Sequence, residues 1–514
     1  MNHFKDVETE SRLQNGESAP SSNVDGLLKQ KNAKRKSDMT LEEMYNNQYD
    51  FEDDEDDDSD WEPSALPDPN VVEIPKWFCI NCTMVNIGVD FHCDICGEHR
   101  ESGILKSGFL ASPFHRADVL TENDTHAADG LQGFRLQSIA SDNLTAIGFD
   151  ERMLLHEEVV RKPHPHPERP DRLEPLLLAL QLQGRYISGK VLSNLSKEIT
   201  REELLMVHSS ENIEAVELTS HVFSSYFTPD TYANEYSASS ARLAAGLCFD
   251  LAAAIYSGSA KNGFALVRPP GHHAGVKQAM GFCLHNNAAI AASAAQIAGA
   301  KKVLIIDWDV HHGNGTQEIF EKNKSVLYIS LHRHEGGKFY PGTGSAYEVG
   351  TMGAEGYCVN VPWSRGGVGD NDYVFAFQCR KFCSYAASEF DPDFTIISAG
   401  FDAARGDPLG CCDVTPTGYA QMTQMCSSLS GGKLLVILEG GYNLRSISSS
   451  ATAVIKVLLG ESPRHNMDQI MPTRAGLRTV LEVLKIQSTY WPSLECRFSK
   501  LLSEWGWYAL QDKS

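Results

Sequence analysis

Residues 303–313 read Val-Leu-Ile-Ile-Asp-Trp-Asp-Val-His-His-Gly, and this stretch decides the predicted fold. Its four leading apolar residues are typical of a strand buried on both faces of a parallel sheet. Alternate side chains of a strand point the same way, so we expect Asp307, Asp309 and His311 to project together where the strand ends. Two carboxylates and an imidazole suit a divalent metal ion. The alternative is a set of polar groups that only caps the strand.

Similar apolar runs recur along the chain and alternate with helical patterns. The predicted strands are 264–267, 303–307, 326–331, 358–361, 394–398 and 434–438. The predicted helices include 239–256, 373–389 and 418–429. Strand–helix alternation predicts an α/β domain with a central parallel sheet and helices on both faces. We place this domain at residues 148–460.

Length and composition bound the class of protein. The 514 residues exceed one compact core, and the 42% hydrophobic content is ordinary for a soluble globular protein. We find no stretch of the roughly 20 apolar residues that spans a bilayer; the nearest, 288–300, is short and alanine-rich. The first residues lack the apolar core of a signal peptide. We therefore expect no membrane association, and a nuclear or cytosolic location in which the 13 cysteines are free thiols or metal ligands.

The charge pattern points to a basic substrate or partner. The net charge is −22, and residues 52–58 are seven consecutive acids. This balance disfavours direct nucleic-acid binding. Residues 1–70 are polar, low in aromatic residues and blocky in charge, so we expect them to be disordered. Within them, 29–36 is either a nuclear localisation signal or a solvated basic stretch, and the acidic run either solubilises the chain or binds basic tails.

A second metal site is predicted at residues 75–100. Two C-x-x-C pairs stand ten residues apart, and each pair places two sulfurs on one turn, as tetrahedral zinc requires; the four ligands are Cys79, Cys82, Cys93 and Cys96. With Trp77 and Asn86, the segment resembles a RanBP2-type zinc finger. Such fingers bind RNA or proteins. Few basic residues surround this one, and it carries Asp90, Asp94 and Glu98, which favours protein over RNA.

Reactive residues follow several predicted strands of the large domain. His272 and His273 come after 264–267, Asp402 after 394–398, and Tyr442 after 434–438. Ligands of open parallel sheets bind beyond the carboxyl ends of the strands. The sequence therefore predicts a metal-dependent active site at this edge of the sheet.

The motifs identify a family resemblance. The matching segments are 268–274, 281–283, 307–315, 398–406 and 438–444. Together they resemble a class II histone deacetylase, here with an N-terminal RanBP2-type finger. The resemblance implies a three-layer arginase/deacetylase-like fold with a central parallel sheet. It leaves 101–147 as a linker and 461–514 as a C-terminal helical extension, which either packs on the domain or mediates self-association.

The resemblance also implies roles for individual residues. The catalytic zinc ligands would be Asp309, His311 and Asp402. His272 paired with Asp307 would stabilise charge, and His273 paired with Asn314 would be the base. Because Asn is neutral, it does not raise the pKa of His273 electrostatically. Tyr442 would donate to the developing oxyanion.

Substrate and potassium sites follow from the same resemblance. The acetyl-lysine tunnel would be formed by Gly281, Phe282 and Tyr340, with Asp230 as the acid at its rim. A structural potassium ion would use Asp307, Ser330 and the carbonyl groups of Asp309, His311 and Leu331. A second potassium site would use Phe320, Val326 and Tyr357. Hard oxygen ligands suit such cations; the alternative is ordinary hydrogen-bonded strand ends.

The implied function is zinc-dependent hydrolysis of N6-acetyl-lysine in proteins, above all core histone tails, with repression of transcription. We expect a nuclear protein that shuttles with the cytoplasm, transcription-factor or corepressor partners, and scope for homo-oligomers. Polyamine deacetylases of the family need an acidic residue after Gly-Asp-Pro, where this chain has Leu409. A scaffold without activity is disfavoured because Tyr442 and every metal ligand are present.

Overall fold

The structure is a computed structural model of the chain. It describes residues 76–78, 85–87, 144–160, 165–177, 191–192, 197–378, 389–463 and 470–510. In the predicted finger it describes only the backbone of two short strands, β1 (Lys76–Phe78) and β2 (Val85–Ile87), which pair antiparallel. The predicted disordered region, the four finger cysteines and linker residues 101–143 lie outside the described residues.

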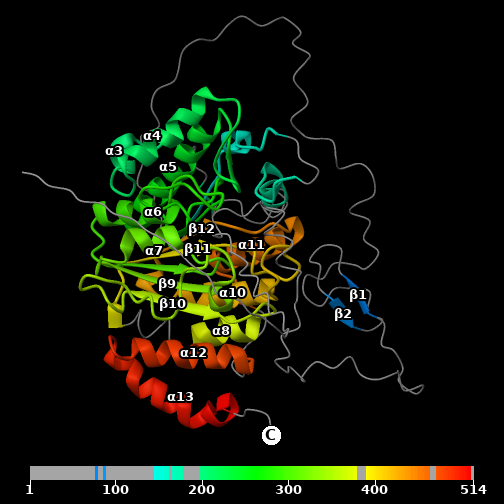
Figure 1. The fold of residues 1–514 in the computed structure, drawn as a ribbon, viewed down its shortest axis with the longest axis vertical. Helices are drawn as coiled ribbons and strands as arrows, with labels where there is room; N and C mark the ends of the chain where they lie inside the picture. Colours follow the sequence, from blue (N-terminus) through cyan, green and yellow to red (C-terminus); the bar gives the residue numbers. More distant parts are fainter. Residues whose placement is uncertain are drawn as a thin grey trace, which may run out of the picture. The chain divides into compact units, whose positions relative to one another are not determined.

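The large domain is built on one eight-stranded parallel sheet (Figure 1). Its strands, in spatial order, are β10 (Cys358–Trp363), β9 (Val326–Arg333), β8 (Val303–Asp307), β11 (Phe394–Ala399), β12 (Leu434–Leu438), β7 (Asn262–Ala265), β3 (Thr145–Gly148) and β4 (Val191–Leu192). The central strands are buried along their whole length, which explains their unbroken apolar runs. The parallel sheet that the sequence predicts is therefore confirmed.

Strand boundaries differ from the prediction by a few residues. β7 begins at Asn262 and ends at Ala265, so the apolar residues 266–267 already lie beyond the strand. β9 and β10 each run two residues further than predicted, to Arg333 and Trp363. β3 and β4 carry no strong pattern and were not predicted, and β3 places the start of the sheet at Thr145.

Helices cover both faces of the sheet. On one face lie α5 (Ser237–Tyr256), α6 (Asn287–Ile297) and α7 (Asn314–Phe320), and the other carries α8 (Asp370–Gln378), α10 (Pro416–Cys426) and α11 (Leu444–Leu458). Alternate residues of each strand feed the two cores: Val303 and Ile305 pack toward α5 and α6, whereas Leu304 and Ile306 face the opposite core. The result is a three-layer α/β domain.

The domain also contains two short helices, one β-hairpin and several 3-10 turns. They are the helices α3 (Arg201–Leu204) and α4 (Ser210–Leu218), the hairpin β5 (Ser225–Thr228) and β6 (Thr231–Ala233), and the 3-10 turns η2 (Glu151–Leu155), η3 (Pro170–Arg172), η4 (Thr219–His221), η5 (Glu335–Gly337) and η6 (Ser430–Gly432).

One helix corrects the hydropathy analysis. Among the residues that the structure describes, α5 alone has the length and apolar composition of a membrane span, whereas we found no such stretch in the sequence. Its most apolar part is 67% buried inside the domain, because α5 packs against both the sheet and the neighbouring helix α6. Its composition is therefore that of a core helix.

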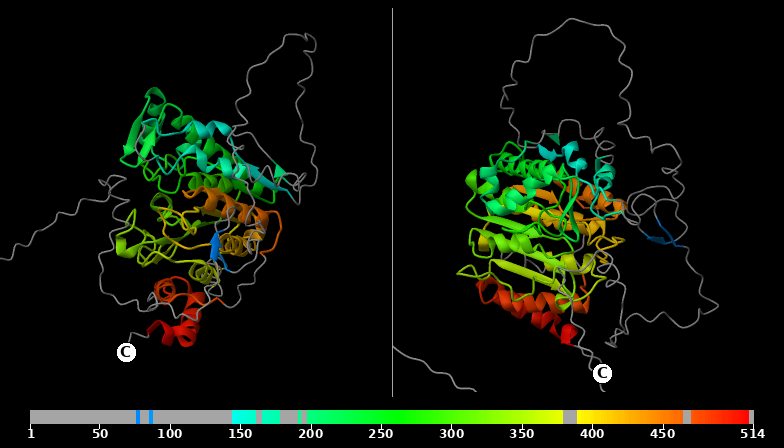
Figure 2. Two further views of the ribbon diagram at one scale, coloured as in Figure 1. Left: turned by 90° about the vertical axis from the view of Figure 1, so that its right-hand side faces the viewer. Right: turned by 45° about the horizontal axis from the view of Figure 1, so that its top comes forward.

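The C-terminal segment packs on the domain, the first of the two alternatives left open by the sequence. α12 (Arg474–Gln487) lies along edge strand β10 and beside α8, and α13 (Pro492–Leu510) packs against α12 (Figures 1 and 2). The side chain of Gln487 donates to the Cys358 carbonyl at 3.1 Å, and the Trp491 indole donates to the Gly356 carbonyl at 2.8 Å. The helix pair thus covers an exposed sheet edge.

Candidate active site

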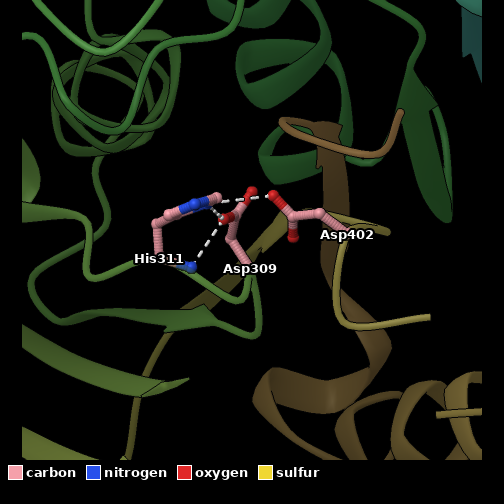
Figure 3. A group of neighbouring side chains, drawn as sticks. All are labelled: Asp309, His311 and Asp402. Carbon is pink, nitrogen blue, oxygen red and sulfur yellow. Dashed lines mark hydrogen bonds and ion pairs between the residues drawn. The ribbon is translucent and has the colours of Figure 1, made fainter. Parts of the chain in front are cut away.

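Three potential metal ligands meet at the carboxyl edge of the sheet. Asp309 and His311 follow β8, and Asp402 follows the neighbouring strand β11 (Figure 3). His311 Nδ1 lies 3.1 Å from Asp309 Oδ1 and 3.1 Å from Asp402 Oδ2. One donor atom from each side chain falls within 4.8 Å of the other two. The parallel pairing of β8 with β11 thus brings together residues from distant parts of the sequence.

Backbone groups orient both carboxylates. Asp309 Oδ2 accepts from the Gly440 N–H at 2.9 Å, and Asp402 Oδ1 accepts from the Val310 N–H at 2.9 Å. Each carboxylate is left with one oxygen facing His311. Position 400 requires glycine, because a Cβ there would lie 2.0 Å from Asp309 Oδ2.

The cluster fits a zinc ion in spacing and charge. Tetrahedral zinc with bonds of about 2.1 Å separates its ligands by about 3.4 Å, close to the distances seen here. Burial and the neighbouring Asp309 carboxylate raise the pKa of Asp402 to about 6. Burial disfavours the His311 cation, yet Asp309 and Asp402 outweigh this and raise its pKa to about 9. The two carboxylates therefore favour a positive charge in the space that they share with His311. A metal ion held by three protein ligands also keeps a coordination position for water or substrate.

His272 forms a buried pair with Asp307. Its Nδ1 lies 3.0 Å from Asp307 Oδ2, and its Nε2 lies 3.8 Å from Asp309 Oδ2. Burial disfavours the imidazolium, but the carboxylates of Asp309 and Asp307 outweigh that and hold the pKa of His272 well above its usual range. The geometry therefore suits a cationic imidazole.

His273 has the opposite electrostatics. Its Nδ1 lies 2.7 Å from Asn314 Oδ1, which fixes Nδ1–H as the donor because an amide oxygen can only accept. Burial, together with His272 and His311, holds the pKa of His273 well below its usual range. The ring is therefore neutral, with an unshared pair on Nε2.

The aromatic residues predicted for the tunnel lie around these histidines. The Tyr340 ring centroid is 5.3 Å from that of His273, and the Phe282 ring meets Tyr442 edge to face at 5.7 Å. Gly281 has φ +57°, and a Cβ there would lie 2.5 Å from the His273 ring. The predicted wall residues and the histidines thus share one site.

The predicted rim acid is tied to the same wall. Asp230 Oδ1 accepts from the Thr231 hydroxyl at 2.9 Å, and that hydroxyl accepts from the Phe282 N–H at 3.0 Å. His166 Nε2 lies 3.0 Å from the Asp230 carbonyl oxygen. Asp230 is therefore held next to the aromatic wall.

The residues predicted for the two potassium sites lie on or next to strands β8, β9 and β10 and at the end of α7. Asp307 stands opposite Ser330 in the β8–β9 register, and Leu331 follows in β9. Val326 opens β9, and the Tyr357 carbonyl accepts from the Tyr328 N–H at 3.0 Å. Phe320 ends α7, and its carbonyl accepts from Asn323. Oxygen atoms are available at both places.

Sequence reasoning missed the residues that hold Tyr442. Asp407 Oδ2 accepts from the Tyr442 N–H at 2.7 Å, and Arg172 donates to the Gly441 carbonyl at 2.7 Å. The Arg172 guanidinium carbon lies 5.1 Å from the Tyr442 ring centroid. Arg172 ends the short 3-10 turn η3, in a segment with no periodic pattern. Its full burial was the informative feature, and only the structure shows it.

Glu168 neutralises this buried arginine and a second one. Its carboxylate accepts from Arg172 Nη1 at 3.0 Å and from Arg268 Nη2 at 2.7 Å, and all three side chains are fully buried. Burial alone would raise the pKa of Glu168, but Arg268 and Arg172 outweigh it and hold this pKa far below its ordinary 4.5. The ion cluster thus links the segment that carries Arg172, which contacts the Tyr442 ring, to the segment that carries Arg268.

Glu168→Gln should destabilise the domain by about 3–5 kcal/mol, because it leaves two guanidinium groups buried without a counter-charge. Denaturant unfolding of the full chain measures the loss, and Glu174→Gln, at an exposed position, is the matched control. A folded-state pKa below the unfolded value stabilises above pH 4.5, and this contribution is lost as pH falls further. The difference in free energy of unfolding between wild type and Glu168→Gln should therefore decrease only below pH 4.5. A difference that is independent of pH would contradict this account.

Comparison with known proteins agrees with this geometry. The histone deacetylase domain model matches residues 166–458, which include every proposed catalytic residue. The chain belongs to the histone deacetylase family. This deacetylase is accordingly a hydrolase of acetyl-lysine, and its family is zinc-dependent.

Individual relatives extend the match. Histone deacetylase 15 of Arabidopsis thaliana is 62% identical over 94% of this chain and 85% of its own length. Histone deacetylase HDA1 of Candida albicans is 42% identical over 68% of the chain and 45% of its own length. A crystal structure of the HDA15 HD domain aligns with TM-score 0.68 and 69% identity, covering 71% of this chain and 99% of that one. The deacetylase therefore spans most of the plant relative and about half of the fungal one.

Proposed function

We propose that this histone deacetylase uses a zinc ion held by Asp309, His311 and Asp402 to hydrolyse N6-acetyl-lysine in core histone tails, and so represses transcription. The observation that carries the proposal is the three-donor cluster, which lies beside one cationic and one neutral histidine. A zinc ion there would polarise the acetyl carbonyl and the attacking water. The chain's own residues then handle the protons and the developing charge.

His273 is the proposed base. Its neutral ring directs an unshared pair from Nε2 into the site, because Nδ1–H is committed to Asn314. It can take a proton from water and return it to the departing lysine amine. His272, held cationic by Asp309 and Asp307, would stabilise negative charge without accepting a proton.

Tyr442 is the proposed oxyanion donor. Burial raises the pKa of its phenol well above the usual value, so the hydroxyl keeps its proton at neutral pH. Asp407 fixes its backbone, and Arg172 and Phe282 contact its ring. A donor that is already oriented strengthens as charge develops on the acetyl oxygen.

An acetylated protein segment is the proposed substrate. A slot between Phe282 and Tyr340 would suit four methylenes and a neutral amide, and Asp230 at its rim would suit substrate backbone N–H groups. The net charge of −22 favours a basic tail. The polyamine deacetylase HDAC10 of Mus musculus is also a relative, at 39% identity. Leu409, only 8% exposed, provides no acid to bind a polyamine cation.

Several finer features complete the proposal. The active-site motifs are those of a class II enzyme. Structural potassium would lie at Asp307 with Ser330 and at the Phe320–Val326 turn. The C-x-x-C pairs would hold a structural zinc in a RanBP2-type finger that binds protein partners, and the basic cluster 29–36 would direct the chain to the nucleus.

The test is acetate release from an acetylated histone-tail peptide by the full chain, with acetylated polyamine as the competing substrate. We expect release from the peptide, its loss on chelation and its return with zinc. Preferential turnover of the polyamine would overturn the assigned substrate. Release that is unaffected by a hydroxamate chelator would overturn the metal mechanism.

A further inference from the structure

Tyr328 reaches the proposed His272–Asp307 pair from the middle of β9. Its side chain is fully buried. In the β8–β9 register Tyr328 stands opposite Ile305, and Asp307 is the next residue along β8 on the same face. Its hydroxyl lies 2.9 Å from Asp307 Oδ2 and 3.2 Å from the Gly313 carbonyl oxygen.

The same oxygen of Asp307 serves both neighbours. Oδ2 lies 2.9 Å from the Tyr328 hydroxyl and 3.0 Å from His272 Nδ1, while Oδ1 accepts from the Asp309 N–H at 3.1 Å. A phenol carries a single proton, and Asp307 is the nearer of its two acceptors. Donors thus face both oxygens of Asp307, and Oδ2 is the oxygen that meets the imidazole.

Gly313 makes this contact possible. A Cβ there would lie 2.4 Å from the Tyr328 hydroxyl, 2.4 Å from Asp307 Oδ2 and 3.1 Å from His272 Nδ1. Any larger residue would push the phenol and the carboxylate apart. Burial raises the pKa of the Tyr328 phenol well above its usual range.

We propose that Tyr328 is a positioning residue for deacetylation: its hydroxyl holds Asp307 Oδ2 against His272 Nδ1 and so fixes the orientation of the His272 ring. The inference rests on the proposed roles of His272 and Asp307. Tyr328 itself touches no reacting atom and acts through the carboxylate. The alternative is a purely structural role, in which the Tyr328 hydroxyl only donates to the Gly313 carbonyl and the ring fills space in the core.

Tyr328→Phe removes one oxygen and keeps the ring that packs in the core. The matched control is Tyr419→Phe, because the fully buried Tyr419 hydroxyl has no hydrogen-bond partner among the described residues. We expect kcat of Tyr328→Phe on the histone peptide to fall about tenfold, as for other residues that orient active-site groups, with KM unchanged. Tyr419→Phe should keep the wild-type kcat. Equal kcat in the two variants would overturn the inference.

Two further measurements separate positioning from a structural role. In a His272→Phe background, Tyr328→Phe should have little further effect on kcat; a full additional tenfold loss there would show that it does not act through His272. In the proton NMR spectrum, the downfield imidazole N–H signal of His272 is identified by its disappearance in His272→Phe. This signal should shift in Tyr328→Phe, and an unchanged position would overturn the proposal. A wild-type chain without deacetylase activity would instead overturn the proposed function.

Discussion

Asp309→Asn should lower deacetylase activity by at least about 10³-fold, the largest effect expected from one substitution. The amide keeps the size of the side chain and can still accept from the Gly440 N–H. It removes one of the two negative charges that would hold the metal ion. Polarisation of the carbonyl by a metal is worth several kcal/mol, and each 1.36 kcal/mol is tenfold in rate.

Acetate release and bound zinc, measured on the same preparation, check this prediction. Asp250→Asn, the same change at an exposed position of α5, should retain both. Because the finger would hold its own zinc, we expect the metal content of Asp309→Asn to fall by one ion per chain and not to zero. Wild-type rates with full zinc in Asp309→Asn would refute the assigned ligand.

His273→Phe should lower kcat by about 10²–10⁴-fold, the usual contribution of a general base. The aromatic ring fills the same space against Tyr340 but has no nitrogen to accept a proton. His272→Phe should also be impaired, because it removes the cation beside Asp307, but it leaves the base in place.

Steady-state kinetics on the histone peptide give the two values, with binding of a fluorescent hydroxamate as the control for an intact metal site. We expect both variants to bind the hydroxamate. Near-full activity in either one would contradict the division of labour between His272 and His273. A larger loss in His272→Phe than in His273→Phe would reverse their roles.

The strands could be predicted because their signal is local. Residues 303–306 and 434–438 are continuous apolar runs bounded by polar residues, and the structure has β8 and β12 at the predicted bounds, 303–307 and 434–438. β3 and β4 escaped prediction because short strands at one side of the sheet carry little pattern. We named 288–300 as the nearest approach to a membrane span and overlooked α5, which has the length and apolar composition of one. Only its burial inside the domain, which composition does not reveal, identifies α5 as a core helix.

The candidate site was predictable to the extent that its chemistry sits at strand ends. Asp309, His311 and Asp402 could be named because each follows an apolar run, and parallel strands end at one edge. Glu168, Arg172 and Tyr328 could not. Glu168 lies outside the helices and strands, Arg172 ends the short 3-10 turn η3, and Tyr328 reads as one more strand residue inside β9. Their contacts join residues far apart in the sequence, such as Arg172 with Gly441.

The sequence by itself determined the kinds of donor at residues 307–313 and the strand that carries them, because side-chain chemistry and a period of two are written locally. The tertiary structure decided how they are used. Pairing of β8 with β11 brought Asp402 to Asp309, and pairing with β9 brought the Tyr328 hydroxyl to Asp307. Which distant strands become neighbours depends on how the whole domain buries its apolar faces, and no local pattern encodes that.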